Sequence, residues 1–139
     1  MTALFLDASV VLLALGGPHP AKPACQSLLR ASGEGRCTLH LSVEAVQEVV
    51  FHRMRVGTRA AALASGRALS ATAVLHGFDV DVLHRSMLLV DTCQIRGRDA
   101  VHAATALAHG FTEIVTTDLD FEAVPGLVVV DPATAVARL

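Results

Sequence analysis

Four acidic residues occupy places from which their side chains could meet at one site that hydrolyses phosphodiesters: Asp7, Glu48, Asp99 and Asp118. Hydrolysis of a phosphodiester needs an activated water and a way to neutralise charge on the phosphate oxygens, and Mg²⁺ held by carboxylates supplies both. Crowded carboxylates repel one another, and a divalent cation relieves that repulsion. These residue types therefore indicate hydrolysis at a metal ion held by oxygen ligands.

Each acid taken alone has a more ordinary explanation. Asp7 could cap the helix that follows it, because aspartate is a common N-cap residue. Glu48 could belong to a solvated helix face, as most helical glutamates do. Glu44 lies one turn before Glu48 on the same predicted helix face, and the residues alone do not decide between these two glutamates.

The elements that must position these acids alternate along the chain. The predicted strands are residues 3–6, 38–41, 80–83, 113–117 and 127–130. The predicted helices are residues 10–15, 23–32, one beginning at 43 with Ser42 as its N-cap, 58–75, 85–93 and 98–109.

This alternation predicts βαβ units with right-handed crossovers, and therefore a mostly parallel sheet with helices on both faces. In such sheets ligands bind beyond the carboxyl ends of the strands. Asp7 and Asp118 each stand just past a predicted apolar strand, so both are expected at one edge of the sheet.

Length and composition favour one globular domain that covers residues 1–139. The hydrophobic fraction is 53%, which suits sheets and helices that bury aliphatic faces. The net charge of -2 gives no overall basic field, so any nucleic-acid contact must be local. The absence of a signal peptide and of a long apolar run predicts a soluble cytoplasmic protein.

Cysteine and histidine patterns argue against two other kinds of site. The three cysteines are odd in number and far apart, which disfavours a disulfide framework and a cysteine zinc site. The seven histidines include no H-E-x-x-H pattern, which also disfavours zinc. His102 shares a helix face with Asp99, and a packing or capping role is the commoner explanation for such a histidine.

Over nearly its whole length the chain resembles the PIN-domain nucleases, in particular the VapC-type toxins of bacterial toxin–antitoxin modules. The resemblance is carried by Phe5–Ser9, by Leu41–Ser42 with Glu48 six residues after Ser42, by Arg98–Ala100 leading into His102–Leu107, and by Val115–Phe121. The last two segments are the most specific.

The resemblance implies a PIN-like three-layer α/β/α fold and an endoribonuclease that depends on Mg²⁺ or Mn²⁺. It maps the family's acidic quartet onto the four acids already named and adds Asp120 as a frequent further member. In that mechanism three aspartates hold the ion, and Glu48 helps to position or deprotonate the attacking water. Ser9 and Thr116 match small hydroxyl positions that support the site. The metal ligands so implied are Asp7, Asp99, Asp118 and Asp120.

The resemblance also implies partners: an RNA substrate, tRNA or rRNA, a VapB-type antitoxin that inhibits the enzyme, and a second copy of the chain in a homodimer. Arg96 and Arg98 are candidates for phosphate contact because they stand beside Asp99. A second basic segment, which includes His52, Arg53, Arg55, Arg59 and Arg67, could contact RNA or could be a solvated helix face without interleaved aromatic residues.

Two other functions stay open. A small phosphatase of the haloacid dehalogenase type would need a second aspartate two residues after Asp7, where Ser9 stands. A non-catalytic PIN-like module that binds protein or RNA would not need the full set of acids. A serine hydrolase is disfavoured because no G-x-S-x-G pattern occurs.

Overall fold

Parallel strands form the central layer of the molecule. The computed structural model describes residues 2–139. Strands β1 (Thr2–Phe5), β2 (Cys37–Ser42) and β3 (Val74–His76) form one sheet in the order β1-β2-β3. Strands β4 (Glu113–Val115) and β5 (Val128–Val130) form a second sheet. A parallel bridge between Leu6 and Val115 joins the two sheets. All pairings within residues 2–139 are parallel, as predicted.

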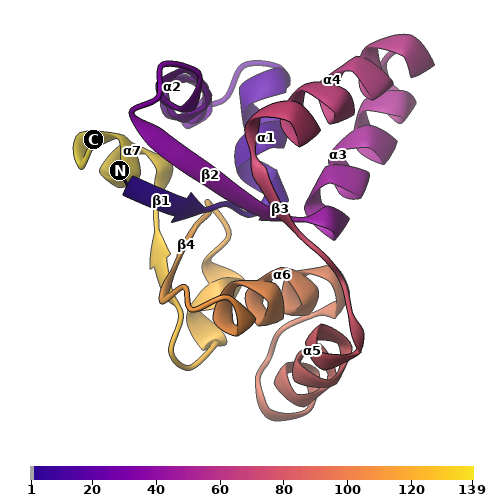
Figure 1. Cartoon of the computed structure of the whole chain (residues 1–139), viewed down its shortest axis with the longest axis vertical. Coiled ribbons are helices and arrows are strands. Elements are labelled where there is room, and N and C mark those ends of the chain that lie inside the picture. Colours follow the sequence, from indigo (N-terminus) through magenta and orange to yellow (C-terminus); the bar gives the residue numbers. More distant parts are fainter. Residues whose placement is uncertain (1) are drawn as a thin grey trace.

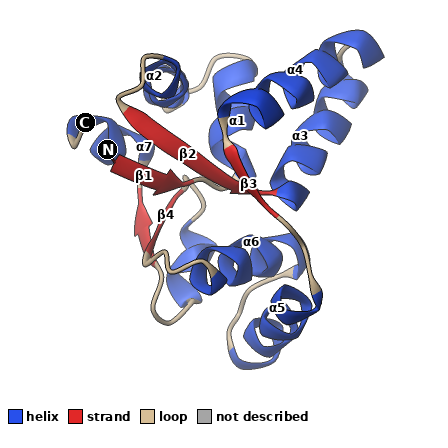
Figure 2. Ribbon diagram, viewed as in Figure 1, coloured by secondary structure: helices blue, strands red, loops and turns tan. Residues whose placement is uncertain are grey.

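Helices cover both faces of these strands (Figure 1). One group consists of α1 (Ala8–Leu15), α2 (Lys22–Gly33), α3 (Val43–Val56) and α4 (Arg59–Thr72), and the other of α5 (Val80–Thr92) and α6 (Gly97–Ala108). Figure 2 shows the strands between the two groups. A short 3₁₀ helix, η1 (Leu119–Ala123), follows β4, and α7 (Pro132–Ala137) packs beside α2 near the C-terminus. No helix within residues 2–139 is long and apolar enough to cross a membrane.

The side chains of β1 alternate between the two faces of the sheet. Leu4 and Leu6 pack into the core under α1 and α2, whereas Phe5 packs into the core under α6 with Ile114 and Phe121. Full burial of each such side chain contributes about 1.5–3 kcal/mol relative to exposure. The two cores fix the position of β1, and so of Asp7 directly beyond it.

Two helices near the site start at side-chain caps. The Ser42 hydroxyl accepts a hydrogen bond from the Ala45 main-chain N–H at 3.1 Å and starts α3, as predicted. Asp79 caps α5 by accepting from the Val82 N–H at 2.9 Å. These bonds satisfy main-chain donors that the helices leave unpaired.

Two predicted elements are wrong. The segment 80–83 is the first turn of α5 and not a strand, because the Asp79 cap and the burial of Val82 favour a helix there. The helix predicted over 58–75 ends at Thr72, and Leu75 lies in β3, where it pairs with Leu41 of β2.

Candidate metal centre

The predicted acids lie beyond the carboxyl ends of β1 and β4, beside the start of α6. Asp7 directly follows the Leu6 bridge, and its main-chain N–H donates to the Val115 carbonyl at 3.0 Å. This bond joins the ends of the two strands. Asp99 lies in the first turn of α6 and Asp118 just after β4. Elements far apart in the sequence therefore bring these carboxylates to one edge of the sheet.

Asp7 does not cap the helix that follows it. It occupies the N-cap position of α1, yet its side chain makes no capping hydrogen bond. Its Oδ2 instead accepts a hydrogen bond of 2.9 Å from the Thr116 hydroxyl, and the side chain is buried. The carboxylate is therefore directed at Thr116 and not at the first N–H groups of α1, and the capping explanation does not hold.

Asp99 lies in the electrostatic centre of the cluster. Burial, then the negative charges of Asp7 and Asp118, and finally that of Glu48, raise the pKa of its carboxyl to about 6, while His102 opposes the shift. Desolvation and like charges both disfavour the ionised form. The structure thus brings the other three predicted acids close enough to Asp99 to act on its carboxyl.

Asp118 and Asp120 share the turn after β4. The Asp118 N–H donates to the Thr116 hydroxyl, and Asp118 Oδ1 accepts from the Asp120 N–H, each at 2.9 Å. One oxygen of Asp118 therefore holds the turn. Asp120 is exposed, and its main-chain N–H rather than its carboxylate contacts Asp118.

Glu48 lies near the middle of α3, and its carboxylate approaches two residues of α6. Its Oε1 is 3.7 Å from His102 Nε2 and 3.8 Å from Arg98 Nη1. His102 is the main cause that lowers the pKa of the Glu48 carboxyl, against burial, which raises it. Glu48, and not Glu44, is the glutamate of α3 that raises the pKa of Asp99.

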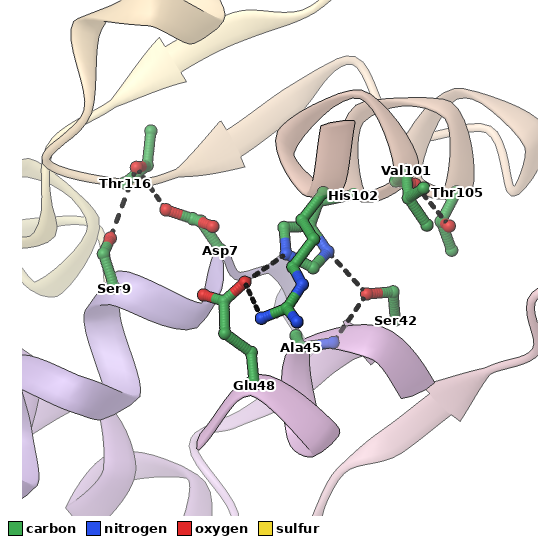
Figure 3. Close-up of polar contacts among 10 residues, drawn as sticks. Asp7, Ser9, Ser42, Ala45, Glu48, Val101, His102, Thr105 and Thr116 are labelled. Atoms are coloured by element: carbon green, nitrogen blue, oxygen red, sulfur yellow. Dashed lines mark hydrogen bonds and ion pairs between the residues drawn. The ribbon is translucent and has the colours of Figure 1, made fainter. Parts of the chain in front are cut away.

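His102 belongs to the cluster, which the sequence did not lead us to expect. A carboxylate oxygen of Asp7, one of Asp99 and a ring nitrogen of His102 all lie within 4.8 Å of one another. The ring is fully buried, and its Nδ1 lies 2.7 Å from the Ser42 hydroxyl (Figure 3). The three-residue spacing from Asp99 was the available signal, because it places both side chains on one face of α6.

The predicted basic residues lie at the rim. Arg98 is exposed, and it lines a groove of about 360 Å³ together with Leu12, Glu48, Phe51, His52 and Arg55. Arg96 is the exposed N-cap residue of α6. The expectation that the basic segment lacks an aromatic neighbour requires correction, since Phe51 is 49% exposed in this groove.

The hydroxyl groups predicted to support the site form one small network. The Thr116 side chain is buried, bonds Asp7 and Asp118 as described, and lies 3.4 Å from Ser9 Oγ. Thr117 is exposed. Thr116 therefore holds two of the acids relative to each other.

The substitution Thr116→Val should remove this support while it keeps the side-chain shape. We expect hydrolytic activity to fall roughly 10–100-fold, the usual effect of losing a group that orients a metal ligand. The free energy of unfolding should fall by about 1–3 kcal/mol, because polar groups lose a buried partner. Steady-state kinetics and urea denaturation measure the two effects. Thr117→Val is the matched control, and equal activity losses in both variants would contradict the assignment.

The cluster fits a hard divalent cation. Apart from the His102 ring, its donors are carboxylate oxygens, the ligands that Mg²⁺ and Mn²⁺ prefer. Burial and the like charges of the neighbouring acids both raise the pKa of Asp99, and a cation would relieve the repulsion among these charges.

Comparisons with known proteins identify a family and a shared fold. Residues 4–127 match the PIN domain family. The chain is 30% identical over 135 residues to the ribonuclease VapC7 of Mycobacterium tuberculosis, which covers 95% of this chain and 93% of that protein. It is 26% identical over 126 residues to a VapC ribonuclease of Mycobacterium bovis, which covers 89% of this chain and 96% of that protein.

Solved structures share the fold. VapBC2 of Rickettsia felis, bound to a promoter DNA fragment, superposes with a TM-score of 0.73 at 13% identity, over 94% of this chain and 98% of that chain. VapC20 of M. tuberculosis, described as a toxin that cleaves the sarcin-ricin loop, superposes with a TM-score of 0.70 at 18% identity, over 86% and 93% of the two chains. At these identities the likeness concerns the fold.

Proposed function

Because this chain belongs to the PIN-domain family, we propose that it is a metal-dependent endoribonuclease, the toxin of a VapBC-type toxin–antitoxin pair. The observation that carries the proposal is the convergence of Asp7, Asp118 and Glu48 on the half-buried Asp99, where burial first and then these negative charges raise the pKa of the carboxyl to about 6. A folded protein keeps such repulsion where a cation compensates for it.

We assign the ion to three aspartates, Asp7, Asp99 and Asp118, with the exposed Asp120 as a further acidic group. A bound Mg²⁺ or Mn²⁺ would neutralise charge on the phosphate and lower the pKa of a water molecule. Thr116 keeps Asp7 and Asp118 in place through its two hydrogen bonds. We propose that Glu48, whose carboxyl pKa is lowered chiefly by its contact with His102, accepts a proton from the attacking water.

The groove beside Glu48 suits a nucleic acid strand. Arg98, Arg55 and His52 offer donors to phosphate oxygens, and Phe51 offers a face on which a base can stack. Arg96, also exposed at the start of α6, would extend this surface. We propose a structured RNA, tRNA or rRNA, as the substrate.

The partners we propose come from the relatives. Several solved neighbours are toxin–antitoxin complexes, such as VapBC-1 of Haemophilus influenzae and VapBC of Salmonella typhimurium. We therefore propose an antitoxin of the VapB type, a cytoplasmic location and a homodimer for this protein, which we treat as a single domain.

Cleavage of a panel of tRNA and rRNA tests the proposal. The wild type should cut at discrete positions with Mg²⁺ or Mn²⁺ and stop with EDTA. Asp7→Asn should lower the rate at least about 100-fold. Loss of a group that only orients a metal ligand already lowers activity about 10–100-fold, and loss of a ligand should cost at least as much. Asp91→Asn removes the same charge from an exposed position on α5 and should cleave normally. Folded, metal-loaded protein that cuts none of these RNAs would instead support a binding module.

A further inference from the structure

His102 contacts two side chains at the site: the hydroxyl of Ser42 through Nδ1 and the carboxylate of Glu48 through Nε2 (Figure 3). Ser42 ends β2 and caps α3, Glu48 lies further along α3, and His102 is on α6 one turn after Asp99. Two elements that meet only through tertiary packing are thus linked at the site.

The Ser42 hydroxyl determines which nitrogen of His102 carries the proton. Its oxygen already accepts the Ala45 N–H, and the side chain is only 1% exposed. A buried hydroxyl hydrogen needs an acceptor, and His102 Nδ1 lies 2.7 Å away. The hydroxyl therefore donates to Nδ1, which leaves the proton of the neutral ring on Nε2.

The environment of Nε2 agrees with this assignment. Nε2 is buried and has no hydrogen-bond partner among the described residues. It faces Glu48 Oε1 at 3.7 Å, and the ring also lies beside Asp7 and Asp99. Among carboxylates an N–H is favourable, whereas a lone pair would be repelled. A shift of Glu48 toward the ring would complete a charge-assisted hydrogen bond.

We propose that His102 is a positioning residue of the nuclease site: held in one tautomer by Ser42, it directs its Nε2–H at Glu48 and fixes the carboxylate that acts on the attacking water. This inference rests on the proposed function. Arg98 contacts the same oxygen, but its side chain is exposed to solvent. His102 is fully buried, and it is therefore the more rigid of the two partners of Glu48. His102 acts through Glu48 and does not touch the substrate.

The tautomer can be measured without any activity assay. In ¹⁵N NMR spectra of the metal-free wild type at neutral pH, the His102 ring should carry its hydrogen on Nε2, with Nδ1 unprotonated. Ser42→Ala should abolish this preference, and Ser42→Thr should retain it because it keeps the hydroxyl. A hydrogen on Nδ1, or an Nε2–H preference that survives Ser42→Ala, would overturn the role of Ser42.

Kinetics test the positioning role. His102→Leu should lower kcat roughly 10–100-fold with KM and Mn²⁺ affinity little changed, because Glu48 and not the ion loses its partner. His102→Gln, which restores an N–H donor, should recover most of the rate. Thr105→Val is the control, since the Thr105 hydroxyl is equally buried on α6 and, within residues 2–139, bonds only the Val101 carbonyl.

The outcomes separate this inference from the proposed function. A wild type that cleaves RNA while His102→Leu cleaves equally well, or loses no more than Thr105→Val, overturns the inference and leaves the nuclease assignment intact. Loss of Mn²⁺ binding in His102→Leu also overturns it and makes His102 a metal ligand. A wild type without any nuclease activity removes the proposed function, and the positioning role with it.

Discussion

Replacement of Asp99 by asparagine should have two opposite effects: cleavage falls at least about 100-fold, while the metal-free protein becomes more stable. Activity falls because a proposed metal ligand is lost. Stability rises because a neutral amide costs less to bury than a carboxylate and is not repelled by Asp7 and Asp118; burial and these two charges are the main causes that raise the pKa of Asp99 to about 6. Each unit of raised pKa corresponds to about 1.4 kcal/mol, so with allowance for partial exposure we expect a gain on the order of 1–3 kcal/mol at neutral pH.

RNA cleavage and urea denaturation in EDTA measure these two effects of Asp99→Asn. Asp91→Asn, on the exposed surface of α5, controls for the change in net charge. If Asp99→Asn destabilised the metal-free protein, the carboxylate would be part of a favourable network, and the account of a repulsive cluster would fail. If the variant cleaved RNA normally, Asp99 would not hold the ion.

The stabilisation by divalent cations should depend strongly on pH. The pKa of Asp99 is higher in the folded protein than in the unfolded chain, so the folded state binds more protons between about pH 4 and pH 6. The free energy of unfolding of the metal-free protein should therefore decrease as the pH rises through this interval and level off above it. A cation replaces the proton, and its benefit should be largest above pH 6.

Thermal unfolding with Mg²⁺ or with EDTA across this pH range tests the linkage. At a Mg²⁺ concentration about 100-fold above its Kd the ion contributes about 2.7 kcal/mol, which is an increase in Tm on the order of 10 °C for a chain of this size. Near pH 4.5 the increase should almost vanish. Asp99→Asn should show a weaker pH slope in EDTA. An equal Mg²⁺ effect at both ends of the range would place the ion away from Asp99.

The sequence was a good guide to the acids at strand ends. Apolar runs that end at Asp7 and at Asp118 predicted strands whose carboxyl ends meet, and the parallel sheet joins them there. Periodicity also identified α3 and its Ser42 cap. These features depend on local patterns, namely a short apolar run or an N-cap residue before a helical stripe.

Features that depend on contacts between distant segments were not predictable. Strand β3 has only three residues and is defined by its pairing with β2, whereas the segment 80–83, with valine at two of its four positions, resembles a strand in sequence but lies in α5. The resemblance to the PIN-domain nucleases favoured Glu48, but the residues alone could not choose between Glu48 and Glu44. That choice and the placement of His102 depend on the packing of α3 against α6. Helix α7 was not among the predicted elements, although Asp131 as an N-cap followed by Pro132 at the first helical position is a pattern typical of a helix start.

The most direct test of the central claim is to locate a bound ion. Anomalous diffraction from crystals grown with Mn²⁺ should show a peak in contact with the carboxylates of Asp7 and Asp99, and the peak should disappear in Asp99→Asn. An Mn²⁺ ion bound elsewhere, or its absence from the cluster in protein that cleaves RNA under the same conditions, would contradict the assignment of these acids as the metal centre.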